Sequence, residues 1–453
     1  MGALSLNAGT TRQTSAAAQD KPNIVFILTD DQRWDTLGCS GNSIIETPVM
    51  DSLAKGGVRF ANAFQSSPAC APSRACLFTG LYERTHGFTF GTEKLDRAYY
   101  GETYPMLLHE NGYRTGYVGK THVKFEDGTT EKMFDSFVPL YRKPYKRVVD
   151  GKERHLTDIM GDNAIDFIQG SDQGKPFCLS LNFHAPHAED NDPQQYIWPS
   201  EEDGLFEDDT IPYPANTHLF DGMTGDLKTC FNRMRWWQRF CTPDKFQTMV
   251  KGHYRMITGI DRVIGRIRAE LDAQGIADNT VIVLMGDNGY FLGERGFGGK
   301  FMMYEQSLRV PLIVYDPREE KSVRGRVCDE MALGIDIAPT ILELAGISVP
   351  AGMHGKSLLP LAHGENPDWR RGFLCEYLST EFPSIIQSEG YRTERWKYLR
   401  YINRADSEEL YDLVNDPLEE DNLARKSSHS TQLAQMKELC DNSISRYLSD
   451  CRH

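Results

Sequence analysis

Residues 70–80 combine a thiol with an arginine at the start of a predicted helix and read Cys-Ala-Pro-Ser-Arg-Ala-Cys-Leu-Phe-Thr-Gly. Pro72 favours a helix start, and Gly80 can end the helix. The first N–H groups of a helix attract anions, and Arg74 adds a permanent positive charge one turn from Cys70. These features predict that the Cys70 side chain does chemistry on an anionic group. The alternative is a structural cysteine that precedes a helix.

The pattern Cys-x-Pro-Ser-Arg-x-x-x-Phe-Thr-Gly resembles the signature of the type I sulfatases, in the alkaline-phosphatase-like superfamily. The resemblance implies that Cys70 is converted after synthesis to formylglycine, an aldehyde whose hydrate is the nucleophile. It also implies two partners, a formylglycine-generating maturation enzyme and a sulfated carbohydrate substrate.

Two apolar runs, each followed by acidic residues, are typical of strands buried in a parallel sheet. The run 23–29 ends in Asp-Asp, and the run 280–285 is followed by Gly-Asp-Asn-Gly. Adjacent carboxylates at the end of a buried strand need a cation, whereas the alternative, a solvated loop, does not. Hard oxygen ligands suit calcium or magnesium, and the resemblance favours calcium. The metal ligands that it implies are Asp30, Asp31, Cys70, Asp287 and Asn288.

Basic residues follow other predicted strands. Lys120 and His122 come after the strand 114–119, and an extended segment would point both side chains the same way. His187 follows the strand 176–183. The resemblance implies that these three residues are catalytic.

The resemblance also assigns roles within the catalytic set. Arg74, Lys120 and Lys300 would neutralise the sulfuryl oxygens as negative charge shifts. His187 would protonate the leaving sugar oxygen, and His122 would take the proton whose loss expels sulfate from the hydrate. The residues implied to be catalytic are Cys70, Arg74, Lys120, His122, His187 and Lys300.

Five further residues are candidates for substrate binding. His184 either faces the substrate or packs in the protein. Arg295 occupies a position where many relatives have histidine, which leaves its role open. The segment 231–240 interleaves aromatic residues with arginines, and predicts a wall on which sugar rings stack, or a helix that packs a tryptophan onto the core. The wall candidates are Arg235, Trp236 and Trp237.

Strands that end next to Asp30, Lys120, His187 and Asp287 predict one open parallel sheet, because such sheets bind ligands at the carboxyl ends of their strands. The fold class is therefore α/β, with a large, mostly parallel sheet sandwiched by helices. From residue 368 shorter alternating runs predict a smaller antiparallel C-terminal sheet. The expected organisation is a flexible tail or signal remnant (1–20), a catalytic domain (21–367) with an insertion at about 189–250, and a C-terminal subdomain (368–453).

Composition restricts the partners and the compartment. The net charge of −14 argues against nucleic-acid binding, and a sulfated polyanion would require local cations. No run of apolar residues is long enough to span a membrane. Residues 1–20 resemble either a secretion-signal remnant or a disordered tail, and the first predicts a periplasmic or extracellular protein. Ten scattered cysteines indicate no zinc site, and pairing of Cys230 with Cys241 stays open.

The leading hypothesis is a hydrolase that removes sulfate from an ester, on a carbohydrate. One alternative is a phosphonate or phosphodiester hydrolase of the same superfamily, which can share the Cys-x-Pro-Ser-Arg signature. Another is a protein that binds sulfated glycans without turnover, which requires an unmodified Cys70. The particular sugar, the position of its sulfate, the mode of cleavage and the oligomeric state stay open.

Overall fold

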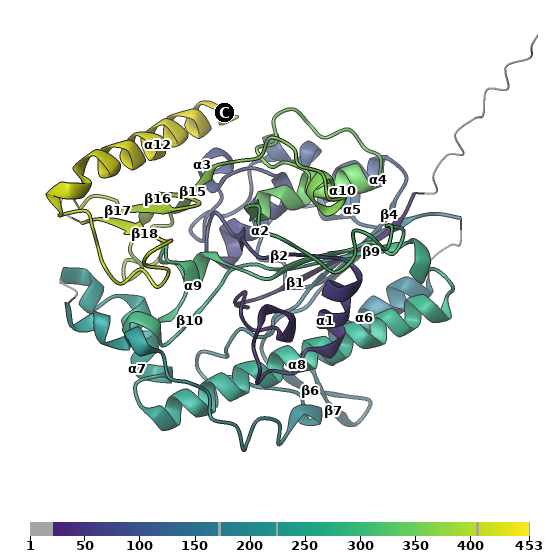
Figure 1. Ribbon diagram of the computed structural model, residues 1–453. Coiled ribbons are helices and arrows are strands. Elements are labelled where there is room, and N and C mark those ends of the chain that lie inside the picture. The colour runs from purple at the N-terminus through teal and green to yellow at the C-terminus, as the bar shows by residue number, and fades with distance from the viewer. Residues whose placement is uncertain (1–20, 171–173, 223–224, 405–406, 453) are drawn as a thin grey trace, which may run out of the picture.

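The computed structural model describes residues 21–170, 174–222, 225–404 and 407–452, so the predicted tail, residues 1–20, lies outside the described part. Within that part, eight strands form one large sheet in the order β13-β2-β12-β9-β1-β8-β4-β5 (Figure 1). β12 is antiparallel to both of its neighbours, and the other paired strands are parallel, which confirms the predicted fold class. In sheet order the bounds are Arg326–Cys328, Val58–Phe60, Leu312–Tyr315, Thr280–Gly286, Asn23–Thr29, Phe177–Asn182, Arg114–Gly119 and Ser136–Pro139.

The large sheet is buried on both faces. Along β1, Phe26 and Leu28 pack in one hydrophobic core, and Val25 and Ile27 pack in a second. This alternation explains why the strand is apolar throughout. One core includes residues of α2 (Cys70–Thr79), α4 (Tyr104–Glu110) and α10 (Ile337–Leu344), and the other includes residues of α1 (Pro48–Gly56), α6 (Leu156–Gln169) and α8 (Pro243–Ala273) (Figure 1).

The sheet register brings the two predicted acidic segments together. β1 lies parallel to β9 with Thr29 opposite Gly286, so the residues that follow both strands leave the sheet at the same edge. β8 and β4 continue the sheet in the same direction beyond β1. The helix α2 ends where Gly80 adopts a left-handed conformation with φ of 67°. The strands β1, β4, β8 and β9 therefore all end at one edge of the sheet, and the first residue of α2 lies at the same edge.

The predicted insertion at about 189–250 contains more regular structure than expected. The helix α7 spans Phe231–Arg239, and α8 begins at Pro243, before the predicted end of the insertion. Thr242 explains the early start, because its hydroxyl accepts a hydrogen bond from the Lys245 N–H at 3.3 Å and Pro243 occupies the first turn. The hairpin of β6 (Lys146–Val149) and β7 (Lys152–His155) lies outside the main sheet.

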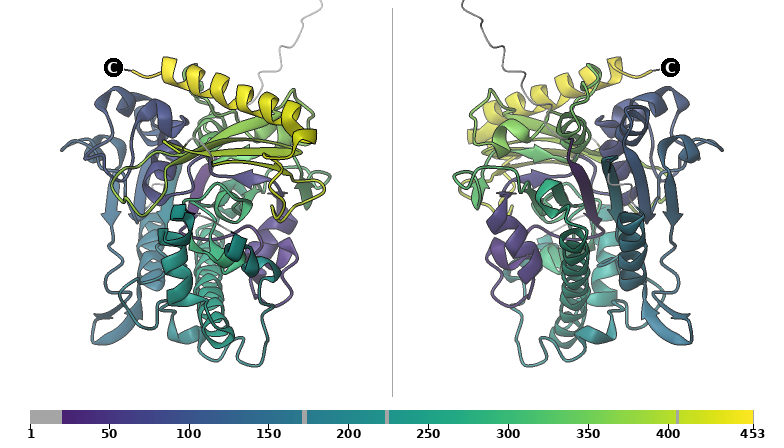
Figure 2. Two further views of the ribbon diagram at one scale, coloured as in Figure 1. Left: turned by 90° about the vertical axis from the view of Figure 1, so that its left-hand side faces the viewer. Right: turned by 90° about the vertical axis from the view of Figure 1, so that its right-hand side faces the viewer.

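A second, antiparallel sheet follows, as the sequence predicts. Its strands are β15 (Gly372–Tyr377), β16 (Ser388–Thr393), β17 (Trp396–Tyr401) and β18 (Glu408–Asp412). The helix α12 (Ser430–Ser449) lies along one face of this sheet (Figure 2). The ten cysteines are all free, so Cys230 and Cys241 do not pair. Among the described helices, none has the length and apolar character that a membrane crossing requires.

A buried ion cluster joins the second sheet to the α/β part. Lys397 of β17 is fully buried, and its Nζ lies 2.6 Å from Glu305 and 2.7 Å from Glu419. Burial opposes the charge of Lys397, but the two carboxylates outweigh it and raise its pKa. The lysine therefore stays charged and holds two buried carboxylates in place.

We expect Lys397→Met to lower the free energy of unfolding by about 3 to 5 kcal/mol, because it leaves two buried carboxylates without their shared lysine. Urea denaturation measures the loss. The matched control is Lys426→Met, which breaks the exposed pair with Asp421 and should change stability by about 0.5 kcal/mol or less. Equal effects of the two substitutions would contradict the assignment.

Candidate active site

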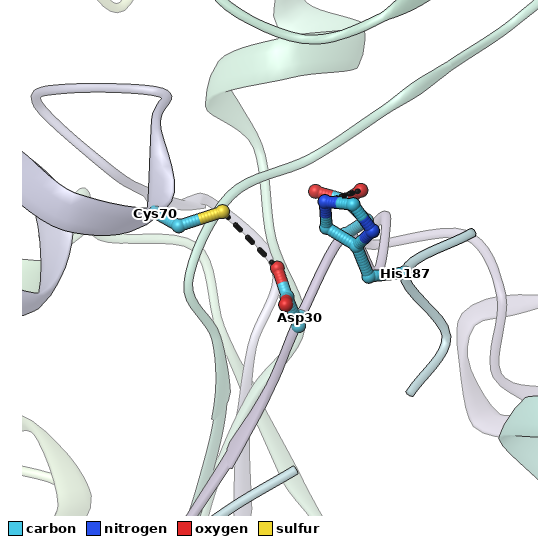
Figure 3. A group of neighbouring side chains, drawn as sticks. Asp30, Cys70 and His187 are labelled. Atoms are coloured by element: carbon cyan, nitrogen blue, oxygen red, sulfur yellow. Dashed lines mark hydrogen bonds and ion pairs between the residues drawn. The ribbon is translucent and has the colours of Figure 1, made fainter. Parts of the chain in front are cut away.

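Cys70 is the first residue of α2 and is buried beside the carboxyl edge of the sheet. Its Sγ donates a hydrogen bond to Asp30 Oδ1 at 3.2 Å, and the Lys300 Nζ lies 2.5 Å from the sulfur. Figure 3 shows the sulfur directed at the Asp30 carboxylate, with the His187 ring on the other side of Asp30. Burial, reinforced by Asp30, raises the pKa of Cys70 to about 12. An unmodified thiol here is thus protonated at neutral pH and is a weak nucleophile.

Three buried carboxylates and an amide surround this position. Asp31 has a left-handed backbone with φ of 69°, and its N–H donates to Asp287 Oδ1 at 3.3 Å. The Asn288 Nδ2 donates to Asp31 Oδ1 at 2.7 Å, while the buried Asn288 Oδ1 has no hydrogen-bond partner among the described residues. Burial and the charge of Asp30 raise the pKa of Asp287 to about 6. Buried oxygens that crowd one another in this way fit a hard divalent cation.

Ligand atoms from Asp30, Asp31, Cys70 and His187 all lie within 4.8 Å of one another. His253 of α8 supports the same group, because its Nε2 lies 3.1 Å from the carbonyl oxygen of Asp31. Burial lowers the pKa of His253 to about 4, so its ring is neutral and can donate this hydrogen bond. The sequence offered no signal for this contact, since it joins residues far apart in the chain.

Three cations alternate with the carboxylates. The Lys120 Nζ pairs with Asp30, and the Lys300 Nζ pairs with Asp31. The Arg74 guanidinium lies 2.8 Å from Asp287 Oδ2. Burial opposes the charge of Lys300, but Asp31 and its neighbours hold the pKa of this lysine well above its usual range. Three fixed cations therefore lie around the sulfur, each paired with a carboxylate.

The histidines lie on the open side of this cluster. The His187 Nε2 lies 3.7 Å from Asp31 Oδ2, and its ring contacts the Arg142 guanidinium. Burial and the Arg142 charge hold the pKa of His187 well below its usual range, so the free ring is neutral. His184 Nε2 lies 2.6 Å from the Leu140 carbonyl oxygen. His122 has φ of 52°, so the chain is not extended at this residue, but Lys120 and His122 line the same cavity.

A cavity of about 690 Å³ opens beside the cluster. Its walls include residues after β4, β5 and β8, together with Ala71, the neighbour of Cys70. The predicted site residues that line it are Lys120, His122, His184 and His187. Arg142 and Asp190 also line it, and the sequence did not predict them. The signal that could have found Arg142 is the edge strand β5, which ends just before it.

The structure does not bring Arg295 to the cavity. Its side chain is buried and donates to the Glu419 carbonyl oxygen and, at 3.3 Å, to the Tyr411 hydroxyl. The prediction that Arg295 contacts substrate is therefore wrong, because its guanidinium binds residues of the C-terminal segment instead.

For residues 231–240 the second alternative is confirmed, a helix that packs a tryptophan onto the core, and no aromatic wall forms at this cavity. Trp236 is buried in the core, Trp237 is 58% exposed, and neither lines the cavity, because neighbouring residues of α7 point in different directions. Only Arg235 is connected to the cavity, through a contact of 3.1 Å with Asp190.

Fold and site together define a hydrolase of anionic esters, with a buried cysteine, a carboxylate cluster that could hold a cation and fixed positive charges at the carboxyl edge of a parallel sheet. The family model for sulfatases matches residues 22–347, and the model described as N-sulphoglucosamine sulphohydrolase, C-terminal, matches residues 293–445. The chain belongs to the sulfatase family, and it is a sulfuric ester hydrolase.

Three similar proteins illustrate the relationship. An N-acetylglucosamine-6-O-sulfatase of Bacteroides thetaiotaomicron is 29% identical over an aligned length of 500 residues. The alignment covers 94% of this chain and 87% of that protein. A structure solved in complex with its substrate D-glucosamine-2-N,6-O-disulfate has a TM-score of 0.79 at 27% identity, and covers 94% of this chain and 98% of its own. A phosphonate monoester hydrolase of Agrobacterium radiobacter has a TM-score of 0.79 at 21% identity, covers 94% of this chain and 96% of its own, and shares the fold.

Proposed function

We propose that this sulfatase acts on a sulfated carbohydrate, with a sulfated amino sugar as the first substrate to test. The observation that carries the proposal is the position of Cys70, within hydrogen-bonding distance of both Asp30 and Lys300 and next in the chain to Ala71, which lines the 690 Å³ cavity. A cavity of this size accommodates a sugar ring together with its ester. The relative from Bacteroides thetaiotaomicron and the disulfated glucosamine in the similar structure point to the same class of substrate.

We further propose that Cys70 is oxidised to formylglycine by a maturation enzyme, and that calcium, with magnesium as the alternative, is held by Asp30, Asp31, Asp287 and Asn288 beside Cys70. The ion would supply Lewis-acid chemistry toward a sulfate oxygen, and the modified side chain would supply the nucleophile. The donor set fits such an ion because Asn288 Oδ1 is buried and lacks a protein partner among the described residues.

The chain's own residues would carry the charge and the protons. Arg74, Lys120 and Lys300 would neutralise the sulfuryl oxygens as negative charge shifts toward the leaving oxygen. The neutral ring of His187 would gain a proton when a sulfate ester brings negative charge next to it, and would give that proton to the sugar oxygen. His122, on the cavity wall, would accept the proton that is lost when sulfate is released.

A substrate panel tests the proposed function. We expect faster turnover of N-acetylglucosamine 6-sulfate and an aryl sulfate than of a phosphonate monoester and a phosphodiester. Free sulfate and free phosphate, measured by ion chromatography, give the two rates. A higher kcat/KM for the phosphorus esters would favour the phosphonate and phosphodiester alternative.

We also propose that the enzyme works in the periplasm or outside the cell. The support is the secretion-signal character of residues 1–20 and the proposed carbohydrate substrate. Fractionation of the native host tests this proposal, and recovery of the active enzyme with the cytoplasmic fraction would contradict it.

A further inference from the structure

The rim of the cavity carries charges that the proposed reaction does not use. Lys124 follows β4 and Lys143 follows β5, and both line the cavity with exposed side chains. Arg142 lies beside Lys143 and lines the cavity too. By contrast, the cations around the sulfur, Arg74, Lys120 and Lys300, are buried, and of these Lys120 lines the cavity. Lys124 and Lys143 are thus separate from the cations around the sulfur, whereas Arg142 also contacts the ring of His187.

Asp190 lines the cavity and is surrounded by arginines. Its carboxylate lies 2.6 Å from Arg239, 3.1 Å from Arg235 and 3.8 Å from Arg142. Burial opposes ionisation, but these arginines outweigh it and lower the pKa of Asp190. Asp190 therefore carries one negative charge against three positive ones.

Glu189, next to Asp190 in the chain, supplies a second carboxylate beside these cations. It lies 3.1 Å from Lys143 and 3.4 Å from Arg142. Lys124 has no ion-pair partner within the described residues. The rim as a whole therefore keeps an excess of positive charge even when both carboxylates are ionised.

This local excess is unusual in a chain whose net charge is −14, because the field of the whole protein repels anions. Exposed cations that line a substrate cavity attract an anionic group of the substrate. The buried cations around the sulfur are a different set, so the exposed rim cations are able to bind another anionic group of the substrate.

The geometry points to a second anion-binding site at the rim, formed by Lys124, Arg142 and Lys143, for a sulfate or carboxylate group on the same glycan as the scissile ester. This inference rests on the proposed carbohydrate substrate. It makes the preferred substrate a polyanionic glycan, and it makes Lys124 and Lys143 determinants of specificity that leave the chemical step unchanged.

The test compares glycans that share the ester to be cleaved. They are N-acetylglucosamine 6-sulfate, glucosamine 2-N,6-O-disulfate, and N-acetylglucosamine 6-sulfate linked to a uronic acid. We expect the wild-type enzyme to show a higher kcat/KM for at least one substrate that carries the second anion. The disulfate and the uronic acid separate a second sulfate from a carboxylate as the recognised group.

Lys124→Gln and Lys143→Gln should each lower kcat/KM for the favoured substrate by about fivefold, mainly through KM, and leave the monosulfated sugar unaffected. Both side chains are exposed, so the variants should fold normally. Lys146→Gln is the matched control, because Lys146 pairs with Glu153 at 3.4 Å and does not line the cavity.

Two results would overturn the second site. One is equal kcat/KM for the substrates with and without the second anion, and the other is a preference that survives both glutamine substitutions. Either would leave the proposed function standing. By contrast, an enzyme that cleaves aryl sulfate but none of the three glycans would count against the proposed carbohydrate substrate itself.

Discussion

Cys70→Ala is expected to lower kcat by about 10⁴-fold or more, because it removes the proposed nucleophile while the remaining groups still bind substrate. The fold should persist, since alanine is compatible with the first turn of α2 and the lost sulfur contacts only Asp30 and Lys300 among the polar groups described around it. Release of sulfate from N-acetylglucosamine 6-sulfate measures the effect.

Cys76→Ala is the matched control on the same helix. The Cys76 sulfur is buried and lies 3.3 Å from His86 Nε2, away from the carboxylate cluster. We expect this variant to lose stability but to keep its kcat. An equal loss of kcat in both variants would mean that α2 is merely a structural support.

Mass spectrometry of the peptide Phe60–Arg74 tests the modification itself. Enzyme purified active from its native host should contain formylglycine at position 70. An unmodified thiol in active enzyme would exclude the proposed nucleophile, and the pKa of about 12 for Cys70 would then require another way to ionise the sulfur.

Removal of divalent cations is expected to abolish activity and to lower the thermal midpoint, and added calcium should restore both. A ligand that binds only the folded state at about 100 times its Kd stabilises that state by about 2.7 kcal/mol. Asp31→Asn should remove the calcium-dependent rise in the midpoint and lower kcat by about 10³-fold, because it takes one charged oxygen from the buried cluster. A calcium titration followed by differential scanning fluorimetry measures the midpoint.

Asp316→Asn is the control for loss of one aspartate charge. Asp316 pairs with Arg318 at 2.6 Å and follows β12, which runs antiparallel to β9 and so ends away from the cluster. Its calcium response should match that of the wild type. If magnesium restores activity and calcium does not, the ion is magnesium. If neither ion restores activity, the proposed metal site is contradicted.

Local sequence alone determined the buried strands, the ends of the helix after Cys70 and the approach of the two acidic segments. The apolar runs of β1 and β9 carry their own signal, because a strand buried on both faces has no polar side. Two further signals are also local in the sequence. One is the acidic residues after each run, and the other is the proline and glycine at the two ends of the helix after Cys70. Two strands of the same kind, each followed by acids, were enough to predict that Asp30 and Asp287 approach one another, and the parallel register of β1 with β9 confirms it.

The tertiary structure alone decided which other side chains face the cavity. Arg295 donates to the Glu419 carbonyl oxygen, and Trp236 packs into the core. Arg142 and Asp190 line the cavity, although the sequence did not predict that they would. Each outcome depends on contacts between segments far apart in the chain, and a short sequence pattern does not predict such contacts. A strand end is set by local periodicity, whereas the direction of a side chain on an irregular segment is set by whatever packs against it.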